Sequence, residues 1–228
     1  MRPTYEDIEY AFELLERINK YTGFFRLNEH SEAKDINCVY ETFNSYLQLM
    51  GIDFYSGASK YCLINDEFDW AIKFDIPECD SKWKKINDYA LHEAEIYEKA
   101  VEWGIEDSFA ACYCIGYING KAICLQEIVE TDEEYFHDKL WDYGAYCMEY
   151  SRDICETEDD FNSMVSDCVD DFSDEERFEA IFNEHEVDIK KLIEFINVYN
   201  LNDFHCGNYG MKRCEGREFP VLIDYSGY

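Results

Sequence analysis

The dipeptide Asn-Gly at positions 119–120 constrains the fold of this chain more than any other short segment. It lies between two runs rich in apolar and β-forming residues, 112–118 and 121–129. Asn-Gly is the preferred pair for a two-residue turn between antiparallel strands, because both residues tolerate the positive φ angles that such a turn needs. The runs KYCLI and DWAIKFDI repeat the arrangement around residues 65–67 (Asn-Asp-Glu). We therefore predict two antiparallel hairpins in the middle of the chain.

Helical periodicity marks the segments around these hairpins, where apolar residues recur at steps of three and four. We expect helices at four places: 5–20, 36–50, 82–103 and 180–199. The first two are expected to support the domain from outside. The strongly acidic stretch 153–178 predicts loops and exposed helix, and two short runs divided by Glu-Gly at 215–216 predict a final hairpin. This mixture of elements predicts an α+β fold.

The charge balance limits the partners of the chain. Asp and Glu number 51 against 20 Lys and Arg, which gives a formal net charge of -31. Such a surface repels phosphate groups, so we expect no direct contact with nucleic acid and none with an anionic membrane. Two interpretations of the acidic excess stay open. It keeps the protein soluble, or it imitates nucleic acid and binds a basic protein partner.

The cysteines and the N-terminal residues predict a cytoplasmic protein. The chain has 11 cysteines, an odd number, and none forms a Cys-x-x-Cys pair. A disulfide framework is therefore not expected. The first residues lack the basic start and apolar run of a signal peptide, and no apolar stretch approaches the roughly 18 residues that span a bilayer.

A candidate metal site lies near the C-terminal end of the sequence. Asp203 and Asn208 stand five residues apart in a loop after the helix expected at 180–199, and Asp224 ends an apolar strand. Three oxygen ligands from these side chains suit Mg²⁺, which leaves its other positions to water and phosphate oxygens.

The same loop resembles the protein-kinase-like superfamily. Its aminoglycoside phosphotransferase and RIO-type branches carry the motif D-x-H-x-G-N, which Asp203, His205, Gly207 and Asn208 match letter for letter. The resemblance implies that Asp203 is the catalytic base and that His205 orders the loop. It also implies that Asn208 and Asp224 are the ligands of Mg²⁺.

The resemblance extends upstream to a lysine and a glutamate. Trp-Ala-Ile-Lys, which ends at Lys73, looks like the strand motif Val-Ala-Ile-Lys of the family. The lysine of that motif holds the α- and β-phosphates of ATP and pairs with a helix glutamate. In the helix expected at 82–103, Glu93 lies on an otherwise small or apolar face and takes the place of that glutamate. Lys73 and Glu93 are thus further candidate catalytic residues.

Two more segments complete the expected nucleotide site. Gly57 and Ser59 precede the first predicted strand, and the resemblance makes them part of a shortened loop that covers the phosphates. Gln126, Glu127 and Ile128 follow the second hairpin turn. The resemblance makes them the hinge, whose backbone bonds the adenine edge.

The resemblance also predicts the domain organisation, a kinase-like two-lobed fold. Residues 1–50 form a helical extension, and residues 51–130 form a small antiparallel sheet with one embedded helix, the N-lobe. Residues 131–228 form a reduced, mostly helical C-lobe. The sequence ends four residues after Asp224, so we expect a minimal, C-terminally truncated member that lacks the activation segment.

Three functions remain open from the sequence. The first is phosphoryl transfer from ATP with Mg²⁺ to an unknown acceptor, held by residues 131–200 or by the N-terminal helices. The second is a pseudokinase-type module that binds nucleotide without transfer. The third is an acidic inhibitor or adaptor, of the kind that phages and mobile elements encode, which binds a basic protein.

Overall fold

The computed structural model describes residues 2–27, 31, 33–56, 60–76, 88–155, 157–182, 185, 187–202, 204–214 and 216–225. These residues divide into two compact units. The sheet unit comprises the described residues up to 99 together with 111–128, and the helical unit comprises 100–110 and those from 129 onward. Each unit is α+β, as the sequence predicts.

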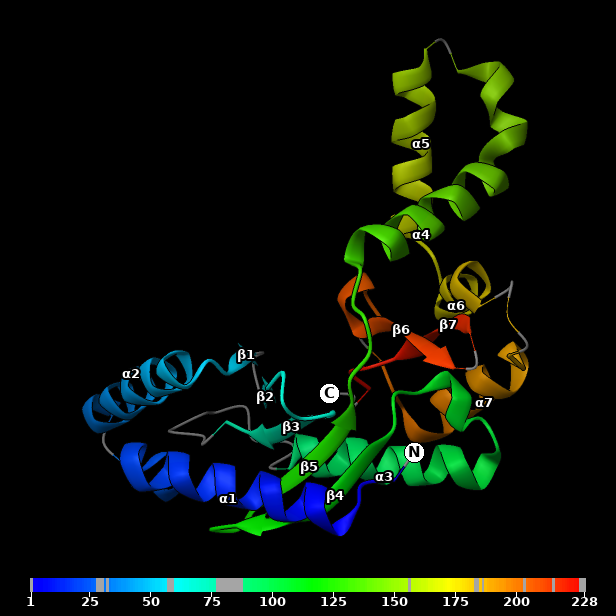
Figure 1. Ribbon diagram of the computed structural model, residues 1–228. Coiled ribbons are helices and arrows are strands. Elements are labelled where there is room, and N and C mark those ends of the chain that lie inside the picture. The colour runs from blue at the N-terminus through cyan, green and yellow to red at the C-terminus, as the bar shows by residue number, and fades with distance from the viewer. Residues whose placement is uncertain are drawn as a thin grey trace. The chain divides into compact units, whose positions relative to one another are not determined.

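The sheet unit is built on an antiparallel sheet of five described strands (Figure 1). Its strands are β1 (Asp53–Ser56), β2 (Lys60–Ile64), β3 (Trp70–Asp75), β4 (Cys112–Ile118) and β5 (Lys121–Glu127), in the spatial order β1-β2-β3-β5-β4. Both predicted hairpins are confirmed, and Asn119 and Gly120 have φ angles of 50° and 81°. Strand β1, which the sequence did not indicate, adds an edge beside β2.

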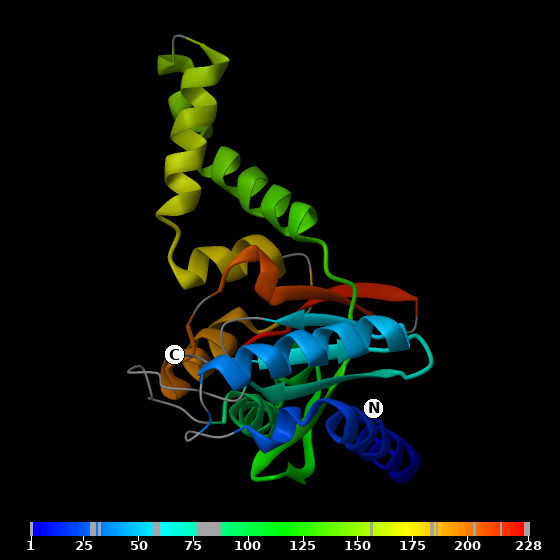
Figure 2. The same ribbon diagram turned by 90° about the vertical axis from the view of Figure 1, so that its left-hand side faces the viewer.

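Two N-terminal helices pack on one face of this sheet (Figure 1, Figure 2). They are α1 (Tyr5–Thr22) and α2 (Ala33–Met50), joined through the short 3₁₀ helix η1 (Phe24–Arg26). Thr4 and Asp7 form a capping box at the start of α1, and Gly23 ends it with a φ of 71°. Both predicted helices are confirmed. They share a core with the sheet rather than only supporting it from outside.

Aromatic rings fill that shared core. Phe24 stacks on Phe43 with ring centroids 4.1 Å apart, and it meets Phe74 of β3 edge-on at 5.7 Å. Tyr61 of β2 contacts Phe43 at 5.1 Å. Because residues 72 and 74 of β3 point into this core, the side chains of Lys73 and Asp75 point to the opposite face of the sheet.

Helix α3 (Tyr89–Trp103) covers this opposite face (Figure 1). The Oδ1 atom of Asp75 accepts the backbone N–H of Ala90 at 2.9 Å, next to the first residue of the helix. The thiol of Cys124 on β5 donates to the carbonyl of Ala90 at 3.2 Å. The sequence predicted this helix over 82–103, and its first residues, 82–87, lie outside the described part of the chain.

The helical unit contains four described helices and a hairpin. They are α4 (Glu133–Met148), α5 (Glu158–Asp170), α6 (Asp174–Phe182), α7 (Ile189–Tyr199), β6 (Tyr209–Cys214) and β7 (Arg217–Leu222). Three 3₁₀ helices accompany them: η2 (Glu106–Ser108), η3 (Glu149–Ile154) and η4 (Cys206–Asn208). The predicted final hairpin is confirmed.

Two sequence predictions in the helical unit were wrong in part. The helix predicted over 180–199 is interrupted, because α6 ends at Phe182 and Asp188 caps a new helix by accepting the N–H of Lys191 at 3.1 Å. The acidic stretch 153–178 holds more than loops and exposed helix. Phe161 and Val165 of α5 are buried, so one face of this acidic helix is packed.

The core of the helical unit brings distant segments together. Phe109 meets Phe195 of α7 and Tyr225 at centroid distances of 5.6 and 5.0 Å. The hydroxyl of Tyr225 donates to the carbonyl of Ala110 at 2.8 Å. Leu222, at the end of β7, accepts the backbone N–H of Ala110 at the same distance. These contacts fix the segment that leads to Asp224.

Among the helices that the structure describes, none combines the length and the apolar character needed to cross a bilayer.

Candidate functional site

A buried carboxylate forms the centre of the candidate site in the sheet unit. Glu93 of α3 is 0% exposed, and its Oε2 atom accepts from the Nζ atom of Lys73 on β3 at 3.0 Å. Its Oε1 atom accepts from the Nζ atom of Lys60, the first residue of β2, at 2.6 Å. Both lysines are 7% exposed. One carboxylate therefore joins two strands of the sheet to the helix above them.

Sheet register explains why both lysines reach the same glutamate. Lys60 lies opposite Asp75, and Cys62 lies opposite Lys73, in the antiparallel pair of β2 and β3. Residues two apart on a strand share a face, so Lys60 and Lys73 are diagonal neighbours on the face that α3 covers. The sequence motif predicted Lys73 and Glu93 but missed Lys60, because only the register shows which face it occupies.

The energetics of this group depend on its pairing. A buried charge without a partner is strongly destabilising, whereas a buried pair with good hydrogen bonds recovers most of the desolvation cost. Glu93 uses both carboxylate oxygens in charge-assisted hydrogen bonds. This geometry holds the two ammonium groups in fixed places on one face of the sheet.

Asp75 is a second carboxyl group in this region. It is 5% exposed, and burial raises its pKa from 3.8 to about 6, although the hydrogen bond from Ala90 acts in the opposite direction. Its Oδ2 atom has no hydrogen-bond partner among the described residues. The positive charge of Lys60 lowers the same pKa by a smaller amount. Asp75 therefore changes its charge near pH 6.

The predicted catalytic loop belongs to the helical unit, and its Asp203 lies outside the described residues. The Nδ1 atom of His205 accepts the N–H of Gly207 at 3.1 Å, which closes a tight turn before Asn208. The side chain of His205 thus holds the backbone of this turn, and the catalytic-loop role that the resemblance gives it stays a prediction. Asn208 is 7% exposed.

The two predicted Mg²⁺ ligands come from neighbouring segments. The carbonyl of Asn208 accepts the N–H of Ile223 at 3.0 Å, and Asp224 is the next residue. Asp224 is half-buried. Among the residues that the structure describes, no three His, Cys, Asp or Glu side chains are arranged to hold a metal ion. That finding concerns neither the Asn208 amide nor Asp203, so the magnesium prediction stays a prediction.

The remaining predicted positions belong to the sheet unit. Gly57 and Ser59 lie outside the described residues, between the end of β1 and the start of β2. In the predicted hinge, Gln126 is buried, Ile128 is 40% exposed, and the N–H of Glu127 donates to the carbonyl of Ala111 at 2.8 Å.

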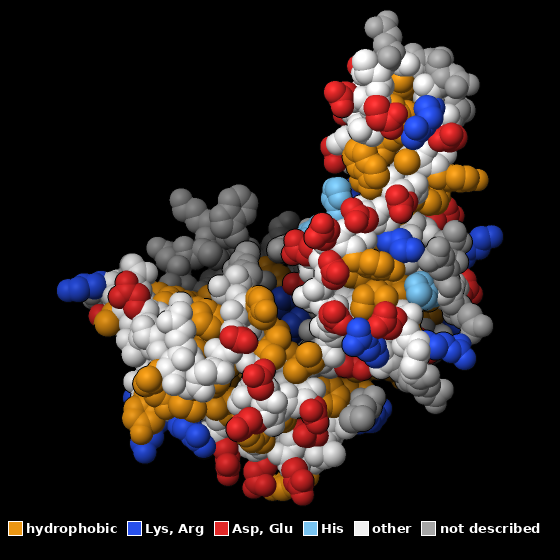
Figure 3. All heavy atoms as spheres, turned by 45° about the horizontal axis from the view of Figure 1, so that its top comes forward, with side chains coloured by type: hydrophobic (Ala, Val, Ile, Leu, Met, Phe, Trp, Pro, Cys, Tyr) orange, Lys and Arg blue, Asp and Glu red, His pale blue; other side chains and the backbone are white. Residues whose placement is uncertain are grey.

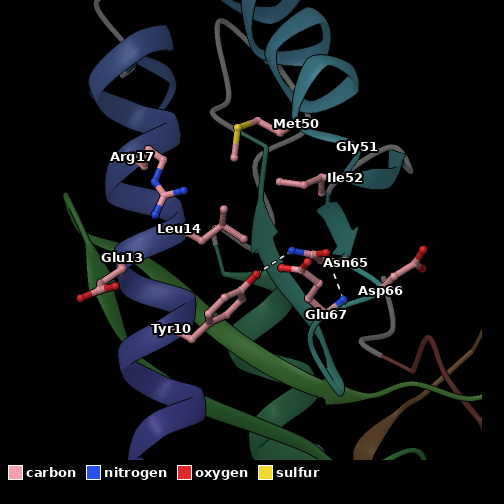
Figure 4. A pocket seen from close by; sticks show the side chains of 10 residues that line it. All are labelled: Tyr10, Glu13, Leu14, Arg17, Met50, Gly51, Ile52, Asn65, Asp66 and Glu67. Carbon is pink, nitrogen blue, oxygen red and sulfur yellow. Dashed lines mark hydrogen bonds between the residues drawn. The ribbon is translucent and has the colours of Figure 1, made fainter.

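A separate pocket of about 490 Å³ lies elsewhere in the sheet unit (Figure 4). Its walls are α1, the end of α2 and the turn between β2 and β3. The sequence did not predict it. Figure 4 shows Tyr10 of α1 hydrogen-bonded to Asn65 of the turn, with Leu14 and Ile52 among the side chains that line the pocket. None of the candidate nucleotide-site residues lines this pocket.

No protein-family model, curated protein or solved structure matches the chain. The function is therefore inferred from the residues themselves.

Proposed function

We propose that the protein binds ATP with Mg²⁺ and transfers a phosphoryl group to an acceptor, as a kinase-like protein of the cytoplasm. The observation that carries the proposal is the buried ion pair between Lys73 and Glu93 at 3.0 Å. The sequence motif points to this strand lysine and this helix glutamate independently of their distance. In protein kinases the corresponding ion pair must be in place for phosphoryl transfer.

The kinase-like two-lobed fold belongs to the same proposal. The sheet unit, with α3 between β3 and β4 in the sequence, corresponds to the N-lobe, and the helical unit corresponds to a reduced C-lobe. The residues 57–59 between β1 and β2 correspond to the loop over the phosphates. Residues 126–128 at the end of β5 correspond to the hinge.

Each residue has a defined chemical task under this proposal. Lys73, positioned by Glu93, neutralises the α- and β-phosphates, while Asn208 and Asp224 hold Mg²⁺, which supplies further charge neutralisation. Asp203 accepts the proton of the acceptor hydroxyl. The hydroxyl oxygen then forms a bond to the γ-phosphorus as the bond between that phosphorus and the β–γ bridging oxygen breaks, and ADP leaves. Electrostatic stabilisation and positioning supply most of the catalysis.

Thermal stability with ATP, measured with and without Mg²⁺, tests the proposal. We expect ATP to raise the melting temperature of the wild type and Mg²⁺ to increase that shift, because a ligand that binds only the folded state stabilises it. Asp224→Ala removes the Mg²⁺-dependent part, whereas the exposed control Asp159→Ala keeps it. No shift at millimolar ATP, or an equal shift with and without Mg²⁺, contradicts the proposal.

Asp203→Ala separates an enzyme from a pseudokinase. We expect this variant to bind ATP as the wild type does and to lose phosphoryl transfer, with ADP formation as the measurement. A wild type that binds ATP but forms no ADP with any acceptor is a nucleotide-binding module instead.

The acidic surface supports a second candidate function, an inhibitor or adaptor that binds a basic protein. The net charge is -31, and Asp and Glu side chains are spread over the face of the molecule shown in Figure 3. Helix α5 contributes exposed carboxylates at positions 158, 159, 160, 167 and 170. Partner binding that weakens steeply with salt and ignores Lys73→Met favours this function over phosphoryl transfer.

A further inference from the structure

Lys60 is a second cation beside Lys73, the lysine that is predicted to bind phosphate. Its Nζ atom lies 2.6 Å from Oε1 of Glu93, and the Nζ atom of Lys73 lies 3.0 Å from Oε2 of the same carboxylate. The glutamate is fully buried, and each lysine is 7% exposed. The two ammonium groups are therefore positioned by one carboxylate, from two adjacent strands.

A single ammonium group is enough to pair with a carboxylate. A second buried lysine has to be desolvated as well, and that desolvation is unfavourable. Lys60, Lys73 and Glu93 together carry one formal positive charge. Asp75, directly opposite Lys60 in the sheet, has a pKa of about 6, so it is mostly ionised at neutral pH and balances that remaining charge. Below about pH 6 Asp75 is protonated, and the group then carries a net positive charge that suits an anionic ligand.

The position of Lys60 in the chain adds a second argument. It is the first residue of β2, and it follows in sequence the residues 57–59 to which the proposed function assigns the covering of the phosphates. A lysine at that place presents a compact positive charge that binds phosphate oxygens from many directions.

We propose that Lys60 is a second phosphate-binding residue, which, together with Lys73, recognises the polyphosphate chain of a nucleoside triphosphate. The inference rests on the proposed function and deepens it, because it assigns the preference for a long phosphate chain to a particular side chain. Two lysines contact more phosphate oxygens than a single lysine does. The affinity of the protein for the nucleotide is therefore expected to increase steeply from AMP to ADP to ATP.

Calorimetric titration of Lys60→Met with ATP, ADP, AMP and adenosine tests this role. We expect the affinity for ATP to fall about tenfold or more, because a hydrogen bond between charged groups is lost, and the affinity for adenosine to stay within about twofold. Lys60→Arg, which keeps the charge, retains most of the preference for ATP. The exposed control Lys20→Met leaves all four affinities unchanged.

A purely structural role for Lys60 gives a different pattern. Lys60→Met then lowers the affinities for ATP and adenosine alike, or leaves both unchanged, and either result overturns the inference. Melting temperatures without ligand show whether the variant is folded. If Lys60→Met does not fold, acetylation of the wild type is measured by mass spectrometry instead. Tripolyphosphate is expected to slow the labelling of Lys60 but not of Lys20, and equal labelling of Lys60 with and without it overturns the inference.

The outcomes also separate this inference from the proposed function. If the wild type binds ATP and Lys60→Met binds it equally well, only the inference fails. If the wild type binds tripolyphosphate through Lys60 but does not bind ATP, the nucleotide function fails and the second phosphate-binding lysine stands. If the wild type binds neither, both fail.

Discussion

The ion pairs of Glu93 in the sheet unit are buried, whereas those of Arg152 in the helical unit are exposed. In the sheet unit, Glu93 is 0% exposed and is held by two buried lysines. In the helical unit, Arg152 makes ion pairs with Glu149 and Glu158 at 3.5 Å, and all three side chains are about half exposed or more. Buried pairs depend strongly on each partner, whereas exposed pairs contribute little. Charge burial therefore distinguishes a candidate site from a solvated surface.

The largest expected effect is at Glu93. Glu93→Ala leaves two buried ammonium groups without their shared partner, so we expect the free energy of unfolding to fall by about 3–5 kcal/mol in urea titrations. Glu95→Ala, on the same helix but with a 61% exposed side chain, is the matched control and changes it by less than about 0.5 kcal/mol. Similar losses for both variants would break the contrast between buried and exposed charge.

Phe161 provides the corresponding test in the helical unit. The acidic helix α5 is expected to be stabilised by its buried apolar face rather than by its charges. The ring is 2% exposed, and Arg152 lies over it at 4.2 Å from the centroid. Phe161→Ala is expected to lower the free energy of unfolding by about 3 kcal/mol. The neighbouring surface change Asp159→Ala leaves it nearly unchanged. A large effect of Asp159→Ala and a small one of Phe161→Ala would show that charge holds α5 in place.

The buried carboxyl of Asp75 makes the free energy of unfolding depend on pH, which exposed carboxyls do much less. Its folded-state pKa of about 6 exceeds the usual 3.8, so the folded protein binds the proton more tightly than the unfolded chain does. Stability is therefore highest when Asp75 is protonated and falls as pH rises from about 4 to about 6, by at most about 3 kcal/mol. Asp75→Asn retains an acceptor for Ala90.

We expect the Asn variant to match the wild type at pH 4 and to be more stable than the wild type at pH 8, as measured by urea unfolding at each pH. If the free energies of unfolding of the wild type and Asp75→Asn differ by the same amount at both pH values, titration of Asp75 is not the cause of the pH dependence.

The smallest effect is predicted at Arg152. Exposed ion pairs typically contribute about 0.2–1 kcal/mol, so Arg152→Gln is expected to lower the free energy of unfolding by less than about 1 kcal/mol. High salt screens such pairs, and the difference from the wild type should shrink in 1 M NaCl. A decrease in the free energy of unfolding above about 2 kcal/mol that persists in salt would show that Arg152 behaves like the buried charges of the sheet unit.

Local chemistry explains which elements the sequence predicted. The turn at 119–120 followed from the backbone preference of Asn-Gly between two β-forming runs, and α1 followed from apolar spacing. Strand β1 was missed because it is a four-residue edge strand with little buried surface. The break between α6 and α7 was missed because the predicted helix was extended upstream of its apolar stripe, which lies within α7, although Asp188 is a good capping residue.

The candidate site also contains residues that the sequence predicted and residues that it missed. Lys73 and Glu93 were predicted because a motif connects the chemistry of both residues to their positions. Lys60 was not, because its contact with Glu93 depends on the register of β2 against β3, which the sequence pattern of one strand does not contain. The pocket between α1 and the β2–β3 turn was missed for a similar reason, since its walls come from three separate segments.

A carboxylate shared by two lysines also affects how this chain tolerates mutation over evolutionary time. If Lys73 is replaced, Glu93 still has Lys60 as a partner, and if Lys60 is replaced it still has Lys73. Neither replacement leaves the acid buried alone, so each single step is less damaging than the loss of Glu93. Descendant sequences can therefore move the lysine that pairs with Glu93 from one strand to the next through viable intermediates. The glutamate is the residue that such lineages are expected to keep.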